Sequence, residues 1–324
     1  MKKGYPLPCV FTAFVIKGFP MMNLNHLRIF LAVAEEKSIT RGAHRLKLSQ
    51  PAVSKELRLL EGALELALFQ RHSRGLELTR EGDVLMGYAR RIFGLESEAE
   101  RSLAEFRGVS RGRVVVGASS TIGVYKFPEI LLQFRDRYPN IEVEMKLKND
   151  KDIQESLLER QCDMAYTGGF IEHRDIEAKP ILMDELVVIT PPGHPAAKKP
   201  ELRIEQILEY PFVLRELGSG MRAIFERFLA SHGLAVKCIM ALNDTEAVKR
   251  SVALGVGLGV LSNLTVDAEI RRGELEVANV KGFPLQRPIQ RLMLRGRAES
   301  PAIRAFHYTL AGTLNRREHR RHSN

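Results

Sequence analysis

Residues 38–79 carry the sequence SITRGAHRLKLSQPAVSKELRLLEGALELALFQRHSRGLELT, in which two helical patterns are joined by a tight turn and followed by a hairpin pattern. In the second helical pattern, Val53, Leu57 and Leu60 recur at the spacing of one helix face. Ser49 is a favourable N-cap for that helix, and Pro51 falls in its first turn, where its missing N–H costs nothing. The stretch therefore predicts a helix-turn-helix followed by a basic hairpin, the wing.

The face of this helix opposite the apolar residues is polar and basic. Side chains of these types reach base edges and phosphates when a helix lies in the major groove of DNA. The residues that we assign to the DNA-binding surface are Ser49, Gln50, Pro51, Ser54, Lys55 and Arg58 in the helix and Arg71 and Arg74 in the wing. The local charge agrees, because residues 41–80 contain eight Lys or Arg and four Asp or Glu, a balance of +4.

Residues 23–82 resemble, without a gap, the N-terminal domain of the LysR-type transcriptional regulators. The matching features are an aromatic first helix, an A-x-x-L second helix, the LSQPAVS turn and helix, the L-F-x-R step and the L-T-x-x-G motif. Gly42 and Ala67 depart from the residues usual in the family, but neither lies on the expected DNA-binding surface. The resemblance implies a winged helix-turn-helix domain over residues 21–80. It also implies a regulator that binds double-stranded DNA as a homodimer or homotetramer.

A long amphipathic helix is predicted over residues 80–107, and we assign residues 81–108 to a linker. Its apolar residues follow one another at steps of three and four, close to the spacing of a paired-helix seam. The residues that we assign to dimerisation are Leu85, Tyr88, Ile92, Leu95, Ala99 and Leu103. The alternative is a helix that packs on its own domain. We favour dimerisation because the helix links two domains and has little else to bury against.

From residue 112 the pattern changes to alternating strands and helices, which predicts an α/β domain with a mostly parallel sheet. This part resembles the effector-binding domain of the same family, which is similar in fold to periplasmic solute-binding proteins. The resemblance implies two lobes over residues 112–313, with crossings near Asp184 and Leu264. Lobe I would then comprise residues 112–183 and 265–313, and lobe II residues 184–264.

Two stretches of this domain are candidates for binding a small anionic effector. Each follows a strand and opens a helix, and hydroxyls and free N–H groups at helix N-termini suit carboxylates and other oxyanions. The candidates are Ser119, Ser120 and Thr121 in the first lobe and Arg215, Ser219, Gly220 and Arg222 in the second. Both stretches lie at carboxyl ends of strands, where open α/β sheets bind ligands. The alternative is a pair of ordinary N-caps beside a solvated arginine.

The composition of the chain limits the number of domains, the kind of partner and the redox compartment. The chain has 324 residues, enough for two or three domains, and its net charge of +10 with a pI near 9.6 favours polyanionic partners. Cys9, Cys162 and Cys238 are widely spaced without a C-x-x-C motif, which predicts buried thiols in a reducing cytoplasm. A redox-sensing pair of Cys162 and Cys238 is the alternative.

The ends of the chain lie outside the family pattern. Residues 1–20 begin with two lysines and an apolar run, but prolines and Lys17 interrupt the run and no A-x-A cleavage site follows. We interpret them as a poorly ordered extension, and residues 314–324 as a solvated basic tail. No segment approaches the roughly 18 apolar residues of a membrane helix. We therefore expect a soluble, cytoplasmic protein that does not bind membranes.

Several classes of protein are disfavoured by what the sequence lacks. There is no H-E-x-x-H, G-x-S-x-G or P-loop motif. The glycines at 255, 257 and 259 resemble a dinucleotide fingerprint, but there the expected helix precedes them and the strand follows, which is the reverse order. We expect no catalytic residues, no metal site and no cofactor. A solute-binding protein, the rival from another class, leaves residues 22–80 unexplained.

Overall fold

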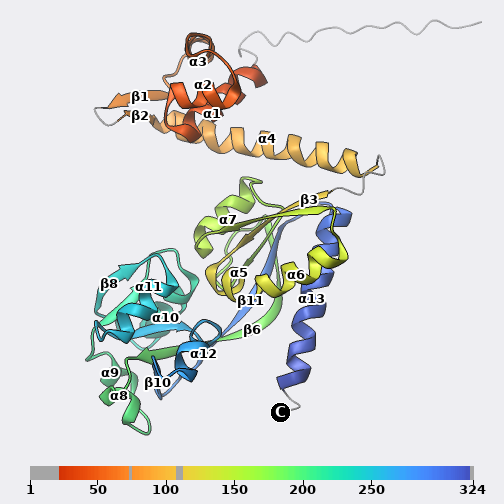
Figure 1. Cartoon of the computed structure of the whole chain (residues 1–324). Coiled ribbons are helices and arrows are strands. Elements are labelled where there is room, and N and C mark those ends of the chain that lie inside the picture. Colours follow the sequence, from red (N-terminus) through yellow and green to blue (C-terminus); the bar gives the residue numbers. More distant parts are fainter. Residues whose placement is uncertain (1–21, 73–74, 107–111, 322–324) are drawn as a thin grey trace, which may run out of the picture. The chain divides into compact units, whose positions relative to one another are not determined.

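The computed structural model describes residues 22–72, 75–106 and 112–321 (Figure 1). The chain divides into two compact units, Met1–Phe93 and Gly94–Asn324. The proposed extension over residues 1–20 lies outside the described residues. In the part that the structure describes, no helix is long and apolar enough to cross a membrane.

The described part of the first unit is a helical domain with a hairpin, and the first half of the long helix that follows the hairpin also belongs to it. Its elements are α1 (Leu24–Glu36), α2 (Ile39–Leu46), α3 (Gln50–Leu64), β1 (Phe69–His72) and β2 (Gly75–Leu78). As predicted, the hydroxyl of Ser49 caps α3, accepting from the Ala52 N–H at 3.4 Å, and Pro51 lies in the first turn. Val53, Leu57 and Leu60 are buried in one core with Phe30. The helical period of the sequence therefore places the core correctly.

Two contacts set the packing inside this unit. A Cβ built on Gly42 of α2 would lie 2.7 Å from Val33 Cγ2 and 3.0 Å from Val33 Cα, so α2 approaches α1 more closely than an alanine permits. The carboxylate of Glu61 in α3 accepts from the backbone N–H groups of Leu68 and Phe69, at 2.8 Å and 3.3 Å. A single side chain thereby fixes the start of the wing against α3.

Helix α4 (Arg80–Phe106) has two apolar faces. Leu85, Ala89 and Phe93 are buried in the core of the first unit. The assignment of Leu85 to the dimerisation surface is therefore wrong, because this side chain already packs on its own domain. Tyr88 and Leu95 are more than half exposed and belong to the other face.

The described part of the second unit contains a seven-stranded sheet and a smaller sheet of two strands. In the first lobe, β3 (Gly112–Ala118) pairs in parallel with β4 (Ile141–Leu147) and β5 (Met164–Thr167). The helices here are α5 (Ser120–Tyr125), α6 (Phe127–Arg137), α7 (Asp150–Leu158) and α13 (Pro301–Arg321). Side chains of α5, α6 and α13 pack in one core of this lobe, and those of α7 pack in another. The lobe is thus a layered α/β structure.

Two long strands connect the lobes. They are β6 (Ile176–Thr190) and β11 (Leu285–Leu294), which pair antiparallel along their lengths and run from one lobe into the other (Figure 1). Strands β9 (Gly259–Ser262) and β10 (Glu276–Ala278) also pair antiparallel with β6, and β5 pairs antiparallel with β11. The expectation of a mostly parallel sheet is therefore wrong for this sheet, because both crossing strands run against their neighbours.

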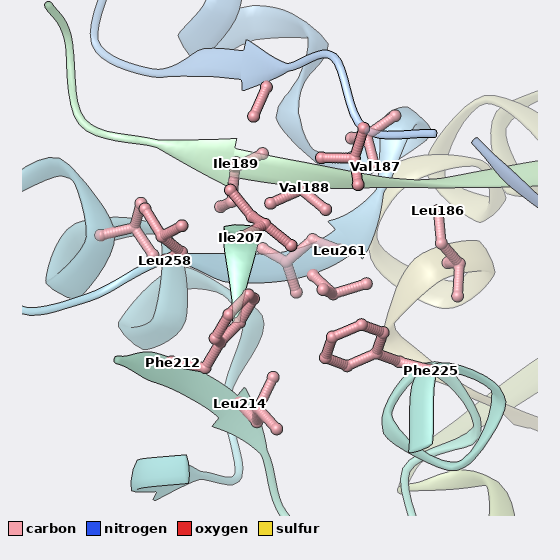
Figure 2. Close-up of a cluster of buried hydrophobic side chains, with 14 of the residues drawn as sticks. Leu186, Val187, Val188, Ile189, Ile207, Phe212, Leu214, Phe225, Leu258 and Leu261 are labelled. Atoms are coloured by element: carbon pink, nitrogen blue, oxygen red, sulfur yellow. The ribbon is translucent and has the colours of Figure 1, made fainter. Parts of the chain in front are cut away.

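The second lobe surrounds the outer part of β6. It contains β7 (Phe212–Arg215) and β8 (Cys238–Leu242), which pair in parallel, with α8 (Pro195–Lys198), α9 (Ile204–Ile207), α10 (Gly220–Ser231), α11 (Thr245–Ala253) and α12 (Asn263–Arg271). Figure 2 shows its core, in which Leu186 and Ile189 of β6 lie among Phe212, Phe225 and Leu261.

The predicted return crossing near Leu264 is wrong. Val266 and Ile270 of α12, together with Leu275 and Ala278, pack in the core of the second lobe. The chain returns through β11 instead, whose first residues pair with the middle of β6. An apolar helix face packs equally well on either lobe, so the pattern of residues 264–280 did not identify its lobe. The last helix also differs from the expectation, because α13 continues through residues 314–321 of the predicted tail.

Candidate functional site

The polar face of α3 is open to solvent. Gln50, Lys55 and Arg58 are exposed, as are Ser49 and Pro51, and Ser54 is half-buried. The Arg58 Nε–H donates to the carbonyl of Ser54 at 3.2 Å, which anchors the guanidinium along this face. The helix therefore presents hydroxyl, amide and basic groups together, and their contact with DNA stays a prediction.

The predicted wing residues are only partly described. Arg71 lies in β1, where its backbone pairs with Leu76 of β2. Arg74 lies outside the described residues. The wing is therefore seen as a hairpin whose two strands flank the predicted basic tip.

An apolar stripe follows the outer face of α4. The dimerisation residues other than Leu85 are all exposed in this structure: Tyr88, Ile92, Leu95, Ala99 and Leu103. Val84, which is not among the predicted dimerisation residues, is also exposed. A row of large exposed apolar side chains on one helix face indicates an interface, and pairing of two chains through it stays a prediction.

The structure joins Ser120 of the first lobe to Arg215 of the second. Arg215 is buried, and its Nη1 donates to Ser120 Oγ at 3.2 Å and to Thr245 Oγ1 at 2.7 Å. Glu216 neutralises the same guanidinium, with contacts of 2.9 Å and 3.1 Å to its two oxygens. Ser120 and Arg215 were both predicted to bind the effector, which stays a prediction, and their contact with each other was not predicted.

Thr121 belongs to a second connection between the lobes. Its hydroxyl accepts from Arg287 of β11 at 3.0 Å, and Arg287 also donates to Asp184 of β6 at 2.7 Å. Ser262 donates to Asp184 at 2.6 Å from the second lobe. Arg287 and Asp184 are both almost completely buried. Nothing in the sequence pattern marked Arg287, because a buried arginine has no periodic signature.

Gly220 makes the third connection. Its N–H, at the start of α10, donates to Oδ2 of Asp150 in the first lobe at 2.6 Å. Ser219 is buried beside it. Asp150 was not among the predicted site residues. A local signal for it exists, because it is an acidic residue that follows a strand and the N-cap residue Asn149 at the start of α7. The start of α10 is therefore in contact with a carboxylate of the chain itself.

Two other predicted effector residues, Arg222 and Ser119, make none of the three connections described above. Arg222 donates to Glu226 at 2.8 Å and to the carbonyl of Arg215 at 3.1 Å, so it supports the lobe from within. The hydroxyl of Ser119 is buried and makes no hydrogen bond within the described residues. Of the two, Ser119 retains a polar group with no protein partner there.

A groove of about 490 Å³ lies at the junction of the lobes. Asp150, Lys151 and Phe170 line it from the first lobe, and Ser219 and Gly220 from the second. A second groove of about 850 Å³ adjoins it and shares Phe170 with it. The start of α10 therefore borders a groove between the lobes. The hydroxyls of Ser120 and Thr121, by contrast, accept hydrogen bonds from Arg215 and Arg287.

Tyr125 adds a further contact across the lobes. Its hydroxyl donates to Glu246 of α11, and the ammonium of Lys249 lies 5.3 Å from the centre of its ring. Burial, and then the hydrogen bond to Glu246, raise the pKa of Tyr125 to about 12. Tyr125 therefore stays neutral and donates at physiological pH.

The described residues contain no cluster of histidine, cysteine and acidic side chains that could hold a metal ion. Cys162 is buried in the first lobe, and burial raises the pKa of its thiol to about 12. Cys238 begins β8 in the second lobe. Both thiols are free. Cys162 packs in a core of the first lobe and Cys238 against the core of the second, and the redox pair stays an untested alternative.

Comparison with known proteins identifies the family. Residues 24–83 match the family model described as bacterial regulatory helix-turn-helix protein, lysR family, and residues 107–314 match the LysR substrate binding domain. The RuBisCO operon transcriptional regulator of Allochromatium vinosum is 35% identical over 285 residues, which cover 88% of this chain and 94% of that relative. The HTH-type transcriptional regulator CysL of Bacillus subtilis (strain 168) is 30% identical over 268 residues, 83% of this chain and 90% of the relative.

Solved structures agree with these matches. The regulatory domain of Synechocystis PCC6803 CcmR, in complex with 2-PG, is 30% identical with a TM-score of 0.60, covering 63% of this chain and 98% of that domain. Full-length CbnR complexed with its target DNA has a TM-score of 0.65 at 21% identity and covers 90% of this chain and 100% of CbnR, which shows the shared fold. The chain belongs to the LysR family of transcriptional regulators, with an N-terminal helix-turn-helix DNA-binding domain and a C-terminal two-lobed effector-binding domain.

Proposed function

We propose that this regulator is switched by a small anion bound at the junction of its lobes, close to the start of α10. The observation that carries the proposal is the convergence of polar groups from both lobes. Ser120 and Thr121 reach the junction from the first lobe, and Ser219 and Gly220 reach it from the second. Helix N-termini and hydroxyls favour oxyanions.

The chemistry of the effector is suggested by the CcmR regulatory domain, whose structure is a complex with 2-PG, 2-phosphoglycolate. We propose a phosphorylated or dicarboxylic small acid for this chain. Such a ligand carries acceptors at both ends and can contact both lobes at once. Only a ligand with different affinities for two arrangements of the lobes shifts their populations.

A few hydrogen bonds to the effector can supply the free energy that such a population shift requires. Reversing a 1:99 population takes about 5.5 kcal/mol of differential affinity, and a hydrogen bond to a charged group contributes about 1.5–3 kcal/mol. Two or three such bonds therefore suffice. Ser219 and Gly220 would supply them directly. Arg215 would support them through Ser120 of the first lobe, and Arg222 through the carbonyl of Arg215.

We further propose that the DNA-binding surface is the exposed face of α3 with the wing, and that chains pair through the exposed stripe of α4. Both proposals rest on the exposure described above. The protein would act in the cytoplasm, where bacterial DNA lies, and would have no enzymatic activity of its own and no cofactor. The RuBisCO regulators among its relatives suggest carbon-fixation genes as targets.

Calorimetry and electrophoretic mobility shift together test the effector proposal. We expect 2-phosphoglycolate to bind the wild-type protein and to change its footprint on the DNA upstream of its own gene. Thr121→Val and Arg222→Ala should lose the ligand response and keep DNA binding. Arg271→Ala, which removes an exposed arginine of α12, is the control and should respond as wild type does. The proposal fails if the ligand that regulates the protein is a cation, or if either variant titrates with its ligand as wild type does.

A further inference from the structure

A buried carboxylate of the first lobe reaches into the second. Asp150, the first residue of α7, is only 7% exposed. Its Oδ1 accepts from the hydroxyl of Thr167 and from the Gly168 N–H at 3.2 Å, and its Oδ2 accepts from the Gly220 N–H at 2.6 Å. Two donors from its own lobe and one from the other therefore hold this side chain.

Glycines on both lobes make this approach possible. A Cβ built on Gly220 would lie 2.6 Å from Gly169 Cα and 2.9 Å from Asp150 Cγ. A Cβ built on Gly169 would lie 2.8 Å from Asp150 Cβ. One residue along, the Lys151 N–H donates to the carbonyl of Gly218 at 3.2 Å. The contact is therefore a close, specific junction of two backbones around one carboxylate.

The carboxylate lies where an anionic ligand would lie. Helix α10 has 12 residues, and its first N–H group points to Asp150 rather than to a side chain of its own N-cap, since Ser219 makes no capping bond. Negative charge is stabilised at this end of a helix. The groove of about 490 Å³ is lined by Asp150, Ser219 and Gly220, so an anion that enters it meets the same N–H.

We propose that Asp150 is an internal ligand that joins the lobes, and that the effector acts by replacing its carboxylate at the start of α10. The replacement step rests on the proposed anionic effector, whereas the joining of the lobes does not. An effector must then compete with a charge that is tethered beside its site. Asp150 thereby sets the concentration at which the regulator responds and selects ligands that carry more acceptors than one carboxylate.

Two substitutions of Asp150 separate the effect of its negative charge from the effect of its hydrogen bonds. Asp150→Asn keeps an acceptor oxygen of similar shape and removes the charge, and Asp150→Ala removes both. Asp152→Asn is the matched control, because Asp152 lies in the same first turn of α7 but is exposed. Circular dichroism confirms that each full-length variant is folded. Calorimetry then measures the binding of 2-phosphoglycolate and of inorganic phosphate, and hydrogen exchange measures protection of the Gly220 amide.

We expect Asp150→Asn to bind 2-phosphoglycolate about tenfold more tightly than wild type, because a charged acceptor is held more strongly than a neutral one. The Gly220 amide should exchange faster in Asp150→Ala than in wild type or in Asp152→Asn. Unchanged or weaker binding by Asp150→Asn, with normal binding by wild type, overturns the competition and leaves the proposed function intact. If neither the wild type nor any variant binds either anion, the proposal of a phosphorylated effector fails. Exchange of the Gly220 amide then still decides whether Asp150 joins the lobes, because unaltered protection in Asp150→Ala refutes it.

Discussion

The ammonium of Lys249 lies 2.9 Å from Oε1 of Glu269, which joins α11 to α12 inside the second lobe. Lys249 is only 4% exposed, and it also contacts Glu246 at 2.6 Å. Burial lowers the pKa of Lys249, but hydrogen bonds to Glu246 and Glu269 outweigh this and hold it above its ordinary value. Burial raises the pKa of Glu269, but the bond to Lys249 holds it below its ordinary value of 4.5.

This pair predicts a pH-dependent stability. A raised lysine pKa contributes stability below about pH 10.4, and a lowered glutamate pKa contributes it above about pH 4.5 and loses it as the pH falls further. Glu269→Gln should therefore lower the free energy of unfolding by about 2 kcal/mol at pH 7, and by less below pH 4. Urea denaturation followed by circular dichroism measures both. Glu274→Gln is the control, because its pair with Arg272 is exposed to solvent and should contribute much less to the free energy of unfolding. An equal loss at pH 3 and pH 7 would contradict the assignment.

The packing of α1 and α2 predicts that a stronger helix former destabilises the domain. Alanine favours helices over glycine by about 1 kcal/mol, but at position 42 its Cβ would meet the Val33 backbone. We expect Gly42→Ala to lower the free energy of unfolding by about 1–2 kcal/mol. Gly62→Ala in α3 is the matched control, since no atom lies within 4 Å of its built Cβ, and it should be neutral or stabilising. Equal effects at the two positions would show that close packing is not decisive.

The exposed face of α3 predicts two kinds of DNA-binding defect. Gln50→Ala and Ser54→Ala should reduce the preference for the operator over random DNA, because these side chains would contact bases. Arg58→Ala should weaken binding to both DNAs and reduce the slope of log K against log salt by about one. Mobility shifts at several salt concentrations measure these effects. Arg135→Ala, an exposed substitution in α6, should change neither. Full operator preference in the Gln50 and Ser54 variants would refute the face assignment.

The exposed stripe of α4 predicts the assembly. The double substitution Ile92→Glu and Leu95→Glu would place two unpaired charges in a seam, which costs several kcal/mol. We expect the variant to sediment as a monomer at a concentration where wild type is a dimer or tetramer. Leu254→Glu, at an exposed leucine that follows α11, is the control and should leave the oligomer intact. A double variant that sediments with wild type would refute the seam.

The local elements of this protein follow from its sequence. The spacing of Val53, Leu57 and Leu60, with the Ser49 cap, determines where α3 begins and which face it buries, because caps and periods act within a few residues. The same holds for the start of α10, because the stretch with Ser219 and Gly220 opens a helix as predicted. Ser120, Thr121 and Gly220 were named as effector candidates because their stretches follow strands and open helices, and effector binding by them stays a prediction.

The tertiary structure determines those features that local sequence patterns do not distinguish. An apolar residue on a helix serves a core or an interface equally well, so only packing assigned Leu85 to the first unit and left Tyr88 exposed. Strand direction also has no local signature, so the antiparallel course of β6 and β11 was missed. The contacts that join the lobes bring Asp150 to Gly220, 70 residues away, and Thr121 to Arg287, 166 residues away. Such buried polar partners are chosen by the fold, because a charge is stable inside a protein only where the folded chain brings complementary groups to it.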